Sequence, residues 1–324
     1  MSKRTLGQFF STHCDVILHG IEKPSENTTI IEPFAGNGDL VKWVERNNVE
    51  EYDIEPRCQT TVQRDTLQNP PSYSNKFVIT NPPYLARNKS TDKELFNKYS
   101  LNDLYKIFME QLCNAVPLGG IVIIPVNFWS SSRFSDIALR TRFLRLFCVE
   151  RVNIFEKRVF DDTSAAVCAF RFDLGESSDI VFRFDPHESS DEITIRFDET
   201  TNYTIGNEII SLKDNNYAHT VSRVLEGQSA PNTSIMLRAL DNISLEWQET
   251  PFYGKKTSRT FASLNIYPPI NNERQKLLIE QFNEYISKNR EKYHSLFLSN
   301  YREASRKRIG FTMVYCIIQY LLSL

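Results

Sequence analysis

The chain has 324 residues, a length that indicates about two domains. Hydrophobic residues make up 41% of the sequence and charged residues 24%, a globular composition that excludes wholesale disorder. The 38 basic and 40 acidic residues give a net charge of −2, which over the whole chain argues against a strongly basic nucleic-acid binder.

Three short apolar runs in the first half of the chain each end at a proline-containing breaker. They are residues 29–31, 76–80 and 121–124, which we predict to be strands buried on both faces. Helical spacing over residues 39–47 and 101–116 predicts helices between them. This alternation indicates an α/β domain with a mostly parallel sheet, whose ligands bind at the carboxyl ends of the strands.

The pattern changes near Gly175. Residues 179–198 alternate between apolar and polar, which predicts antiparallel strands, and helical spacing begins near Asn271 and again at Ile309. We therefore predict an α/β domain over residues 1–175 and an α+β region over 176–324. We expect that region to be β-rich to about residue 250 and then basic and helical.

Cysteine usage and apolar runs exclude further classes. The N-terminal residues lack the apolar region of a signal peptide, and the longest apolar run, 313–324, is too short to cross a bilayer. The six cysteines are scattered without zinc-ligand spacing, which suits a reducing compartment. We expect an intracellular protein that uses neither a membrane nor a metal ion.

A Gly-x-Gly turn, Gly36-Asn37-Gly38, follows the first predicted strand. Such a turn lets a ligand approach bare backbone and the amides that open a helix. The third glycine of a dinucleotide fingerprint and the Gly-Lys-Ser/Thr of a triphosphate loop are both missing. Acidic residues at both ends, Glu32 and Asp39, favour a ligand with a cationic amine. A plain tight turn is the alternative interpretation.

Carboxylates at the next two predicted strand ends extend this pattern. Asp53 or Glu55 lies where a ribose diol is bound in such folds, and Asp65 lies where an adenine amino group can be recognised. For Asp53 and Glu55 a solvated loop acid is the alternative.

The tetrapeptide Asn81-Pro82-Pro83-Tyr84 carries the most specific chemistry. The amine of an adenine is a poor nucleophile because its lone pair is delocalised into the ring. The Asn81 side-chain oxygen and the Pro82 carbonyl can each accept one of its N–H groups, and Pro83 restricts the backbone that aims that carbonyl. Tyr84 offers a stacking face for a base turned out of a duplex.

In this order, the motifs resemble those of the S-adenosylmethionine-dependent N6-adenine DNA methyltransferases with a C-terminal recognition domain, of restriction–modification or large-DNA-virus type. The resemblance implies a Rossmann-like class I methyltransferase domain with S-adenosylmethionine as cofactor. It implies catalysis by Asn81, Pro82, Pro83 and Tyr84, with Tyr84 and Phe160 stacking on the target base. The implied cofactor residues are Phe10, Thr12, Glu32, Pro33, Ala35, Gly36, Gly38, Asp53, Ile54, Asp65 and Asn81.

The near-neutral total charge conceals two opposite stretches. Residues 176–214 hold ten acidic and three basic residues, a net charge of −7, whereas 255–310 hold twelve basic and five acidic residues, a net of +7. A basic stretch with interleaved aromatic residues suits contacts to a nucleic-acid backbone. The predicted DNA contacts are Lys255, Lys256, Arg259, Arg302, Arg306, Lys307 and Arg308.

These features predict a site-specific DNA adenine-N6 methyltransferase that moves a methyl group to a flipped adenine in duplex DNA. We expect a monomer in a bacterial cytoplasm or a virus-infected host cell, protecting DNA from a cognate restriction endonuclease. One alternative is a methyltransferase acting on RNA adenine or protein glutamine. Another is a non-catalytic DNA-binding specificity subunit that retains a decayed methyltransferase fold.

Overall fold

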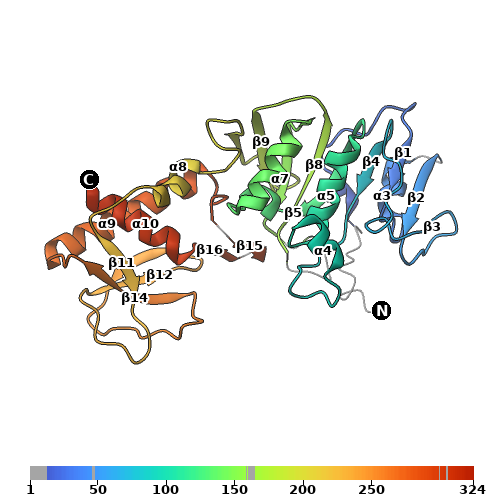
Figure 1. Ribbon diagram of the computed structural model, residues 1–324. Coiled ribbons are helices and arrows are strands. Elements are labelled where there is room, and N and C mark those ends of the chain that lie inside the picture. Colours follow the sequence, from blue (N-terminus) through green and yellow to red (C-terminus); the bar gives the residue numbers. More distant parts are fainter. Residues whose placement is uncertain (1–12, 46–47, 158, 160–164, 299, 304–305) are drawn as a thin grey trace. The chain divides into compact units, whose positions relative to one another are not determined.

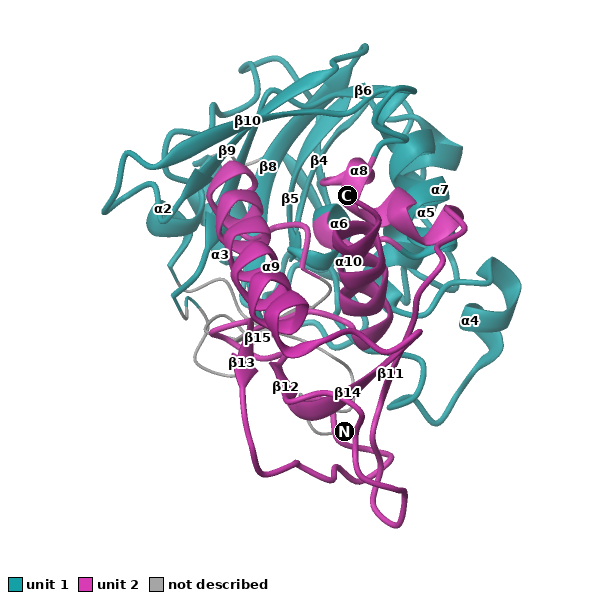
Figure 2. Cartoon of the chain, turned by 90° about the vertical axis from the view of Figure 1, so that its left-hand side faces the viewer, with its two compact units in different colours: residues 1–129, 133–203, 302–305 teal, residues 130–132, 204–301, 306–324 magenta. Residues whose placement is uncertain are grey.

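The computed structural model describes residues 13–324 apart from 46–47, 158, 160–164, 299 and 304–305, and it describes only the backbone of 300–303 and 306. The chain divides into two compact units (Figure 2). The first contains residues 1–129, 133–203 and 302–305, and the second contains 130–132, 204–301 and 306–324.

A mostly parallel sheet forms the centre of the first unit, with the strand order β10-β9-β7-β8-β5-β4-β1-β2-β3 in the described part of the chain (Figure 1). The five strands from β3 to β5 are parallel, and β8 runs antiparallel between β5 and β7. The strands are β1 (Ile30–Glu32), β2 (Val49–Asp53), β3 (Val62–Gln63), β4 (Phe77–Thr80), β5 (Gly119–Pro125), β6 (Phe147–Cys148, paired with β8), β7 (Arg151–Phe155), β8 (Val167–Leu174), β9 (Asp179–Phe184) and β10 (Glu192–Arg196). The predicted α/β class is confirmed.

The three predicted central strands form as expected and are buried at every residue. The strand order reverses beside β1, because β2 lies on one side of it and β4 on the other. In open α/β sheets such a switch point leaves a crevice at the carboxyl ends of the strands, where ligands bind. Those ends carry the motifs that the sequence analysis identified.

Helices cover both faces of this sheet (Figure 2). On one face Ile17 and Leu40 pack against Ile79 of β4, and on the other Phe143 packs edge to face on Phe172, with ring centroids 5.2 Å apart. The helices of the first unit are α2 (Cys14–Ile17), α3 (Asp39–Val44), α4 (Glu94–Tyr99), α5 (Leu104–Ala115), α6 (Asn127–Ser130, whose last residue belongs to the second unit) and α7 (Phe134–Leu144). The predicted helices over 39–47 and 101–116 correspond to α3 and α5.

The alternating segment 179–198 forms two antiparallel strands as predicted, but they extend the sheet of the first unit. β9 pairs with β7 in parallel, and β10 pairs with β9. The first unit therefore continues to Tyr203, past the boundary placed near Gly175 from the sequence. Period-two alternation reveals a half-buried strand, but it does not reveal which sheet the strand joins.

The second unit is an antiparallel sheet covered by helices. Its strand order is β11-β14-β12-β13, and the long helix α9 and the apolar helix α10 form where the sequence predicts them. Leu278, Phe282 and Ile286 of α9 are buried, and Asn283 exchanges two hydrogen bonds with the backbone of Leu245 in β13 (2.8 and 3.0 Å). The elements are α8 (Asn207–Ile210), the 3-10 helix η1 (Ser211–Asp214), β11 (Thr220–Arg223), β12 (Ile235–Arg238), β13 (Ser244–Trp247), β14 (Phe261–Tyr267), α9 (Asn272–Lys292), β15 (Asn300–Glu303, whose last two residues belong to the first unit), β16 (Arg306–Arg308) and α10 (Phe311–Ser323).

Across the described residues, no helix combines the length and apolar character that crossing a membrane requires. The same part of the chain contains no group of three or more His, Cys, Asp and Glu side chains that could hold a metal ion.

Candidate active site

Glu32 ends β1 and is almost completely buried, with 1% of its surface exposed. Its Oε1 atom accepts hydrogen bonds from the Phe34 backbone N–H (3.1 Å) and from the Thr80 hydroxyl at the end of β4 (2.5 Å). Among the described residues, nothing donates to Oε2. Burial raises the pKa of this carboxyl from 4.5 to about 8. The site therefore contains a buried carboxyl oxygen that can accept a hydrogen bond from a ligand.

The raised pKa predicts a pH-dependent stability for the ligand-free protein. The folded form keeps the proton on Glu32 up to about pH 8, whereas an unfolded chain releases it near pH 4.5, so the contribution of this group falls as pH rises between these values. Glu32→Gln removes that dependence. Relative to the wild type, we expect the variant to gain on the order of 3 kcal/mol of unfolding free energy between pH 5.5 and 8. Urea unfolding at both pH values measures this gain, and a pH-independent difference would contradict the account.

The loop after β1 is shaped by backbone hydrogen bonds. Gly36 and Gly38 have φ angles of 54° and 73°, in the left-handed region that favours glycine. The Ala35 N–H donates to the Tyr52 carbonyl (2.9 Å), and the Gly38 N–H donates to the Ala35 carbonyl (2.7 Å). These two amides are therefore engaged within the protein. They fix the shape of the loop and are not available to a ligand. The expectation from the sequence was the opposite, that a ligand would approach bare backbone at this turn.

Asp53 at the end of β2 fastens this loop. Its Oδ2 atom accepts from the Gly36 N–H (2.9 Å) and its Oδ1 atom from the Glu55 N–H (2.8 Å), and only 4% of the residue is exposed. Glu55, the alternative considered for the same role, is exposed, as is Ile54 at 39%. A carboxylate can accept about four hydrogen bonds. The buried Asp53 is therefore the better placed of the two to bind a hydroxyl group beside Gly36.

Asp65 organises the turn that follows β3. Its Oδ1 atom accepts from the backbone N–H groups of Leu67 (3.1 Å) and Gln68 (3.0 Å). The neighbouring Thr66 hydroxyl donates to the Pro33 carbonyl (2.9 Å), which ties this turn to the loop after β1. The structure thus links the predicted cofactor residues Glu32, Pro33, Ala35, Gly36, Gly38, Asp53 and Asp65 through three adjacent strand ends.

The tetrapeptide Asn81–Tyr84 leaves the end of β4 at the same edge of the sheet. Asn81 and Pro82 are buried, whereas Pro83 and Tyr84 are half-buried. The Tyr84 hydroxyl lies 2.7 Å from the Ile123 carbonyl and also contacts the Asn81 Oδ1 atom. Burial raises the pKa of this phenol well above its usual range. The tyrosine is therefore folded inward, with its hydroxyl at the amide oxygen to which the sequence analysis assigns catalysis.

The segment around Asn102 is hydrogen-bonded to the residues that follow the tetrapeptide. Directly after Tyr84, the Leu85 carbonyl accepts from the Leu104 N–H (3.2 Å), and the Arg87 N–H donates to the Asn102 carbonyl (2.9 Å). Lys106 anchors this segment, because its Nζ atom donates to Asn102 Oδ1 (2.9 Å) and to the buried Asp136 (2.7 Å). Four residues of this arrangement were not predicted from the sequence: Thr66, Thr80, Lys106 and Asp136. A lysine within a largely apolar predicted helix was the one available signal.

The remaining predicted site residues either have side chains outside the described part of the chain or lie in the second unit. Phe10, Thr12 and Phe160 fall outside the described residues, and the side chains of Arg302 and Arg306 are likewise not described. Lys255, Lys256 and Arg259 of the second unit are exposed, and Lys307 and Arg308 are half-buried.

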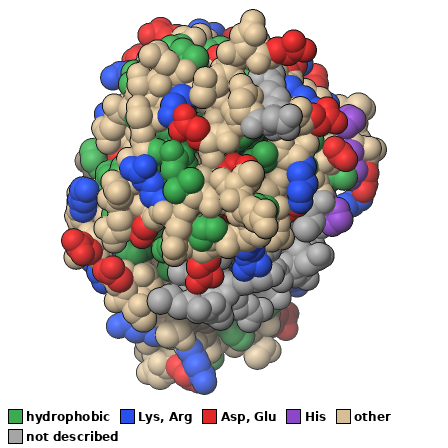
Figure 3. Space-filling model, turned by 90° about the vertical axis from the view of Figure 1, so that its right-hand side faces the viewer, with side chains coloured by type: hydrophobic (Ala, Val, Ile, Leu, Met, Phe, Trp, Pro, Cys, Tyr) green, Lys and Arg blue, Asp and Glu red, His purple; other side chains and the backbone are tan. Residues whose placement is uncertain are grey.

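Two basic segments of the second unit, residues 255–259 and 307–308, lie on neighbouring stretches of backbone. The Ala239 N–H donates to the Thr260 carbonyl (2.8 Å), and the Ile309 N–H donates to the Ala239 carbonyl (3.1 Å). The residue after Arg259 and the residue after Arg308 are thus joined through Ala239, although about fifty positions separate them in sequence. On the face of the molecule in Figure 3, by contrast, acidic and basic side chains are interspersed and neither sign predominates.

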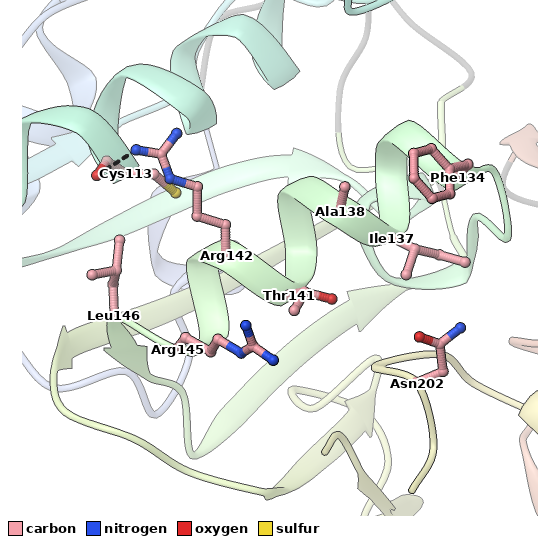
Figure 4. Close-up of a pocket in the computed structure, with 9 residues that line it drawn as sticks. All are labelled: Cys113, Phe134, Ile137, Ala138, Thr141, Arg142, Arg145, Leu146 and Asn202. Carbon is pink, nitrogen blue, oxygen red and sulfur yellow. Dashed lines mark hydrogen bonds between the residues drawn. The ribbon is translucent and has the colours of Figure 1, made fainter. Parts of the chain in front are cut away.

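A pocket of about 560 Å³ lies along α7 (Figure 4). Its two cations have partners within the protein: Arg142 bonds to Asn114 Oδ1 (2.8 Å) and Arg145 to Glu199 (3.3 Å). None of the predicted site residues lines it. The lining residues are Cys113, Phe134, Ile137, Ala138, Thr141, Arg142, Arg145, Leu146 and Asn202.

Comparison with known proteins finds a family match within the first unit. Residues 29–160 match the family described as Eco57I restriction-modification methylase. The type II methyltransferases M.HincII and M.HindII of Haemophilus influenzae are each 27% identical over 205 residues, which cover 55% of this chain and 39% and 38% of theirs. The chain thus spans about two fifths of the length of these relatives.

Solved structures also resemble the chain at low sequence identity. One is the methyltransferase subunit of a type I restriction–modification system from Streptococcus thermophilus, which is 14% identical with a TM-score of 0.42. The similarity covers 62% of this chain and 52% of that one. Another is the type IIG restriction endonuclease BpuSI, which is 15% identical with a TM-score of 0.41 and covers 69% of this chain and 36% of its own.

Proposed function

We propose that this chain, which carries an Eco57I restriction-modification methylase domain over residues 29–160, transfers a methyl group from S-adenosylmethionine to the N6 atom of adenine in double-stranded DNA. One observation carries the proposal. The tetrapeptide Asn81–Tyr84 leaves β4 beside the switch point of the sheet, and Thr80 directly links this strand end to the buried Glu32.

The strand-end loops fit the chemical groups of S-adenosylmethionine. The Glu32 Oε2 atom, which lacks a donor among the described residues, suits the ammonium group of the methionine portion, whose positive charge lowers the pKa of the carboxyl and favours its ionised form on binding. Asp53 suits the ribose hydroxyls, Ile54 the adenine ring and Asp65 the adenine amine, with Pro33, Ala35, Gly36 and Gly38 shaping the loop around the cofactor. When bound, the cofactor supplies an electrophilic methyl group on a sulfonium.

The tetrapeptide supplies the groups that orient the acceptor amine. Asn81 Oδ1 and the Pro82 carbonyl each accept one N–H of the adenine amine, which points the nitrogen lone pair at the methyl group. For this, the amine takes the place of the Tyr84 hydroxyl at Asn81. The displaced tyrosine ring stacks on the flipped base together with Phe160, and Pro83 fixes the backbone. No strong base is needed, because the cationic product amine loses its proton readily to solvent.

The second unit provides a surface for the DNA backbone. Lys255, Lys256 and Arg259 lie on a stretch of backbone joined through Ala239 to the segment that carries Lys307 and Arg308, so these positive charges can neutralise phosphates of a bound duplex. We extend the proposal to Arg302 and Arg306 from their place in the same basic stretch. The methyl group then protects the DNA from a cognate restriction endonuclease, which is the expected partner. The monomeric state stays a prediction.

The assignment to DNA is tested by offering labelled S-adenosylmethionine together with duplex DNA, RNA and a protein extract. We expect label in duplex DNA and background levels in RNA and protein. Label confined to RNA or to protein glutamine would overturn the proposal in favour of another acceptor amine. Binding of DNA without transfer to any acceptor would instead indicate a non-catalytic specificity subunit.

A further inference from the structure

A short basic loop, residues 255–259, lies within the connection between β13 and β14 in the second unit. Its three charged side chains, Lys255, Lys256 and Arg259, are exposed, and Tyr253 just before it is 39% exposed. Both ends of the loop are attached to neighbouring backbone. The Gly254 carbonyl accepts from the Glu226 N–H (3.2 Å), and the Thr260 carbonyl accepts from the Ala239 N–H (2.8 Å). Between these ends, three like charges lie within five residues.

Arg223 holds the middle of this loop. Its Nη2 atom donates to the Lys256 carbonyl and its Nη1 atom to the Ser258 carbonyl, each at 2.7 Å. The two bonds come from one planar guanidinium, so they fix the distance and direction between the two carbonyls. A turn bond from the Ser258 N–H to the Lys255 carbonyl (2.8 Å) completes the loop.

Arg223 is itself firmly placed. It ends β11 and pairs with Leu264 of β14, and the next residue, Val224, donates its N–H to the Ser263 carbonyl (2.9 Å). Its guanidinium also lies over the Phe311 ring at the start of α10, 5.1 Å from the ring centroid. The end of β11 is held by the sheet, so the two hydrogen bonds from Arg223 hold the loop in a fixed place relative to β11. Lysine could donate to both carbonyls only from one point charge and would fix them less well.

We propose that Arg223 is a positioning residue that preorganises the basic loop 255–259 to bind the phosphates of duplex DNA. The inference depends on the proposed function for the DNA substrate. Without Arg223, the repulsion among Lys255, Lys256 and Arg259 favours many loop conformations, and DNA binding has to order them at an entropic cost. With Arg223 in place, the three side chains start from one backbone arrangement and add to the charges of Lys307 and Arg308 beside them.

The first arm of the test uses the protein without DNA. Trypsin cleaves after lysine and arginine, so its rate at Lys255, Lys256 and Arg259 reports how often the loop opens. We expect Arg223→Met to accelerate these cleavages several-fold and Arg223→Lys to give an intermediate rate. Arg274→Met is the matched control, because it removes an equal charge and tryptic site from α9, where Arg274 contacts the Leu321 carbonyl (3.4 Å). Equal loop cleavage in Arg223→Met and the control would overturn the proposal.

The second arm measures how the affinity for duplex DNA depends on salt. Each neutralised phosphate contributes about 0.9 to the slope of log K against log salt, so loss of three loop contacts lowers the slope by about 2 to 3. We expect this decrease for the triple variant Lys255→Ala/Lys256→Ala/Arg259→Ala. Arg223→Met keeps the three loop charges, so it should lower the affinity several-fold at each salt concentration and change the slope by less than about one. Adding Arg223→Met to the triple variant should change neither the affinity nor the slope any further, because Arg223 acts only through the loop charges.

The outcomes separate the inference from the proposed function. If the wild type binds DNA and the triple variant lowers the slope but Arg223→Met leaves the affinity unchanged, the inference alone fails. A further decrease of about one when Arg223→Met joins the triple variant would mean that Arg223 contacts DNA itself, which also overturns a positioning role. If the wild-type protein neither binds nor methylates duplex DNA, the proposed function fails and the inference fails with it.

Discussion

Asn81→Ala is expected to lower the rate of methyl transfer at least about a thousandfold and to leave the affinity for S-adenosylmethionine within a few fold of the wild type. The variant removes the side-chain oxygen that accepts one N–H of the acceptor amine, an interaction made with the reacting group itself, and such losses reduce kcat. Single-turnover methylation of duplex DNA measures the first effect and calorimetric titration with cofactor the second.

Asn114→Ala is the matched control for this experiment. Asn114 also lies in the first unit, but it is exposed on α5 and bonds to Arg142 (2.8 Å) at the surface. It should change neither quantity. If Asn81→Ala abolishes cofactor binding, Asn81 belongs mainly to the cofactor site. If transfer persists, the tetrapeptide does not orient the amine.

Asp53→Ala is expected to weaken cofactor binding on the order of a hundredfold, because it removes a buried carboxylate that holds the loop and faces the proposed ribose position. The Gly36 N–H and the Glu55 N–H each lose their charged acceptor, and hydrogen bonds of this kind are worth about 1.5–3 kcal/mol. Tenfold in affinity corresponds to about 1.4 kcal/mol. Calorimetric titration with S-adenosylmethionine measures the change.

Glu55→Ala tests the alternative carboxylate in the same titration. Its side chain is exposed, so we expect an affinity within a few fold of the wild type. The opposite order, with Glu55→Ala as the more damaging change, would assign the ribose to Glu55. Circular dichroism of both variants should show the same folded content, so that a loss of binding is not mistaken for unfolding.

Much of the first unit could be predicted from the sequence because its signals are local. A buried parallel strand needs a continuous apolar run, and a βα loop needs a breaker at its end, so residues 29–31, 76–80 and 121–124 revealed both the strands and the edge that carries the motifs. The spacing of Leu104, Phe108 and Leu112 likewise predicted α5, which begins at Leu104.

Long-range pairings could not be predicted in this way. The strands β9 and β10 have the expected alternation, but their membership in the first sheet depends on the pairing of β9 with β7. The Thr80 contact to Glu32 spans 48 positions, and the inward Tyr84 hydroxyl meets a carbonyl 39 positions away. Such contacts are decided by tertiary packing, which leaves no periodic signal in the sequence.

The conclusion drawn from net charge depends on the length of chain over which it is summed. The total of −2 argues against a nucleic-acid partner, whereas the +7 stretch over residues 255–310 favours one. The net charge of a segment does not show which other segments lie beside it. In the structure, Ala239 joins the residues after Arg259 and Arg308. Arg223 was not identified from the sequence, because a single arginine at a strand end has no signature until the loop it holds is known.

The identity of the methylated nucleoside tests the central claim most directly. Duplex DNA methylated by the purified protein with labelled S-adenosylmethionine is digested to nucleosides, and the labelled product is separated by chromatography with mass detection. The arrangement of Asn81 and Pro82 around an exocyclic amine predicts label in N6-methyladenine. Label in N4-methylcytosine would keep the amine chemistry but contradict the adenine assignment, and label on a ring carbon would contradict the mechanism itself.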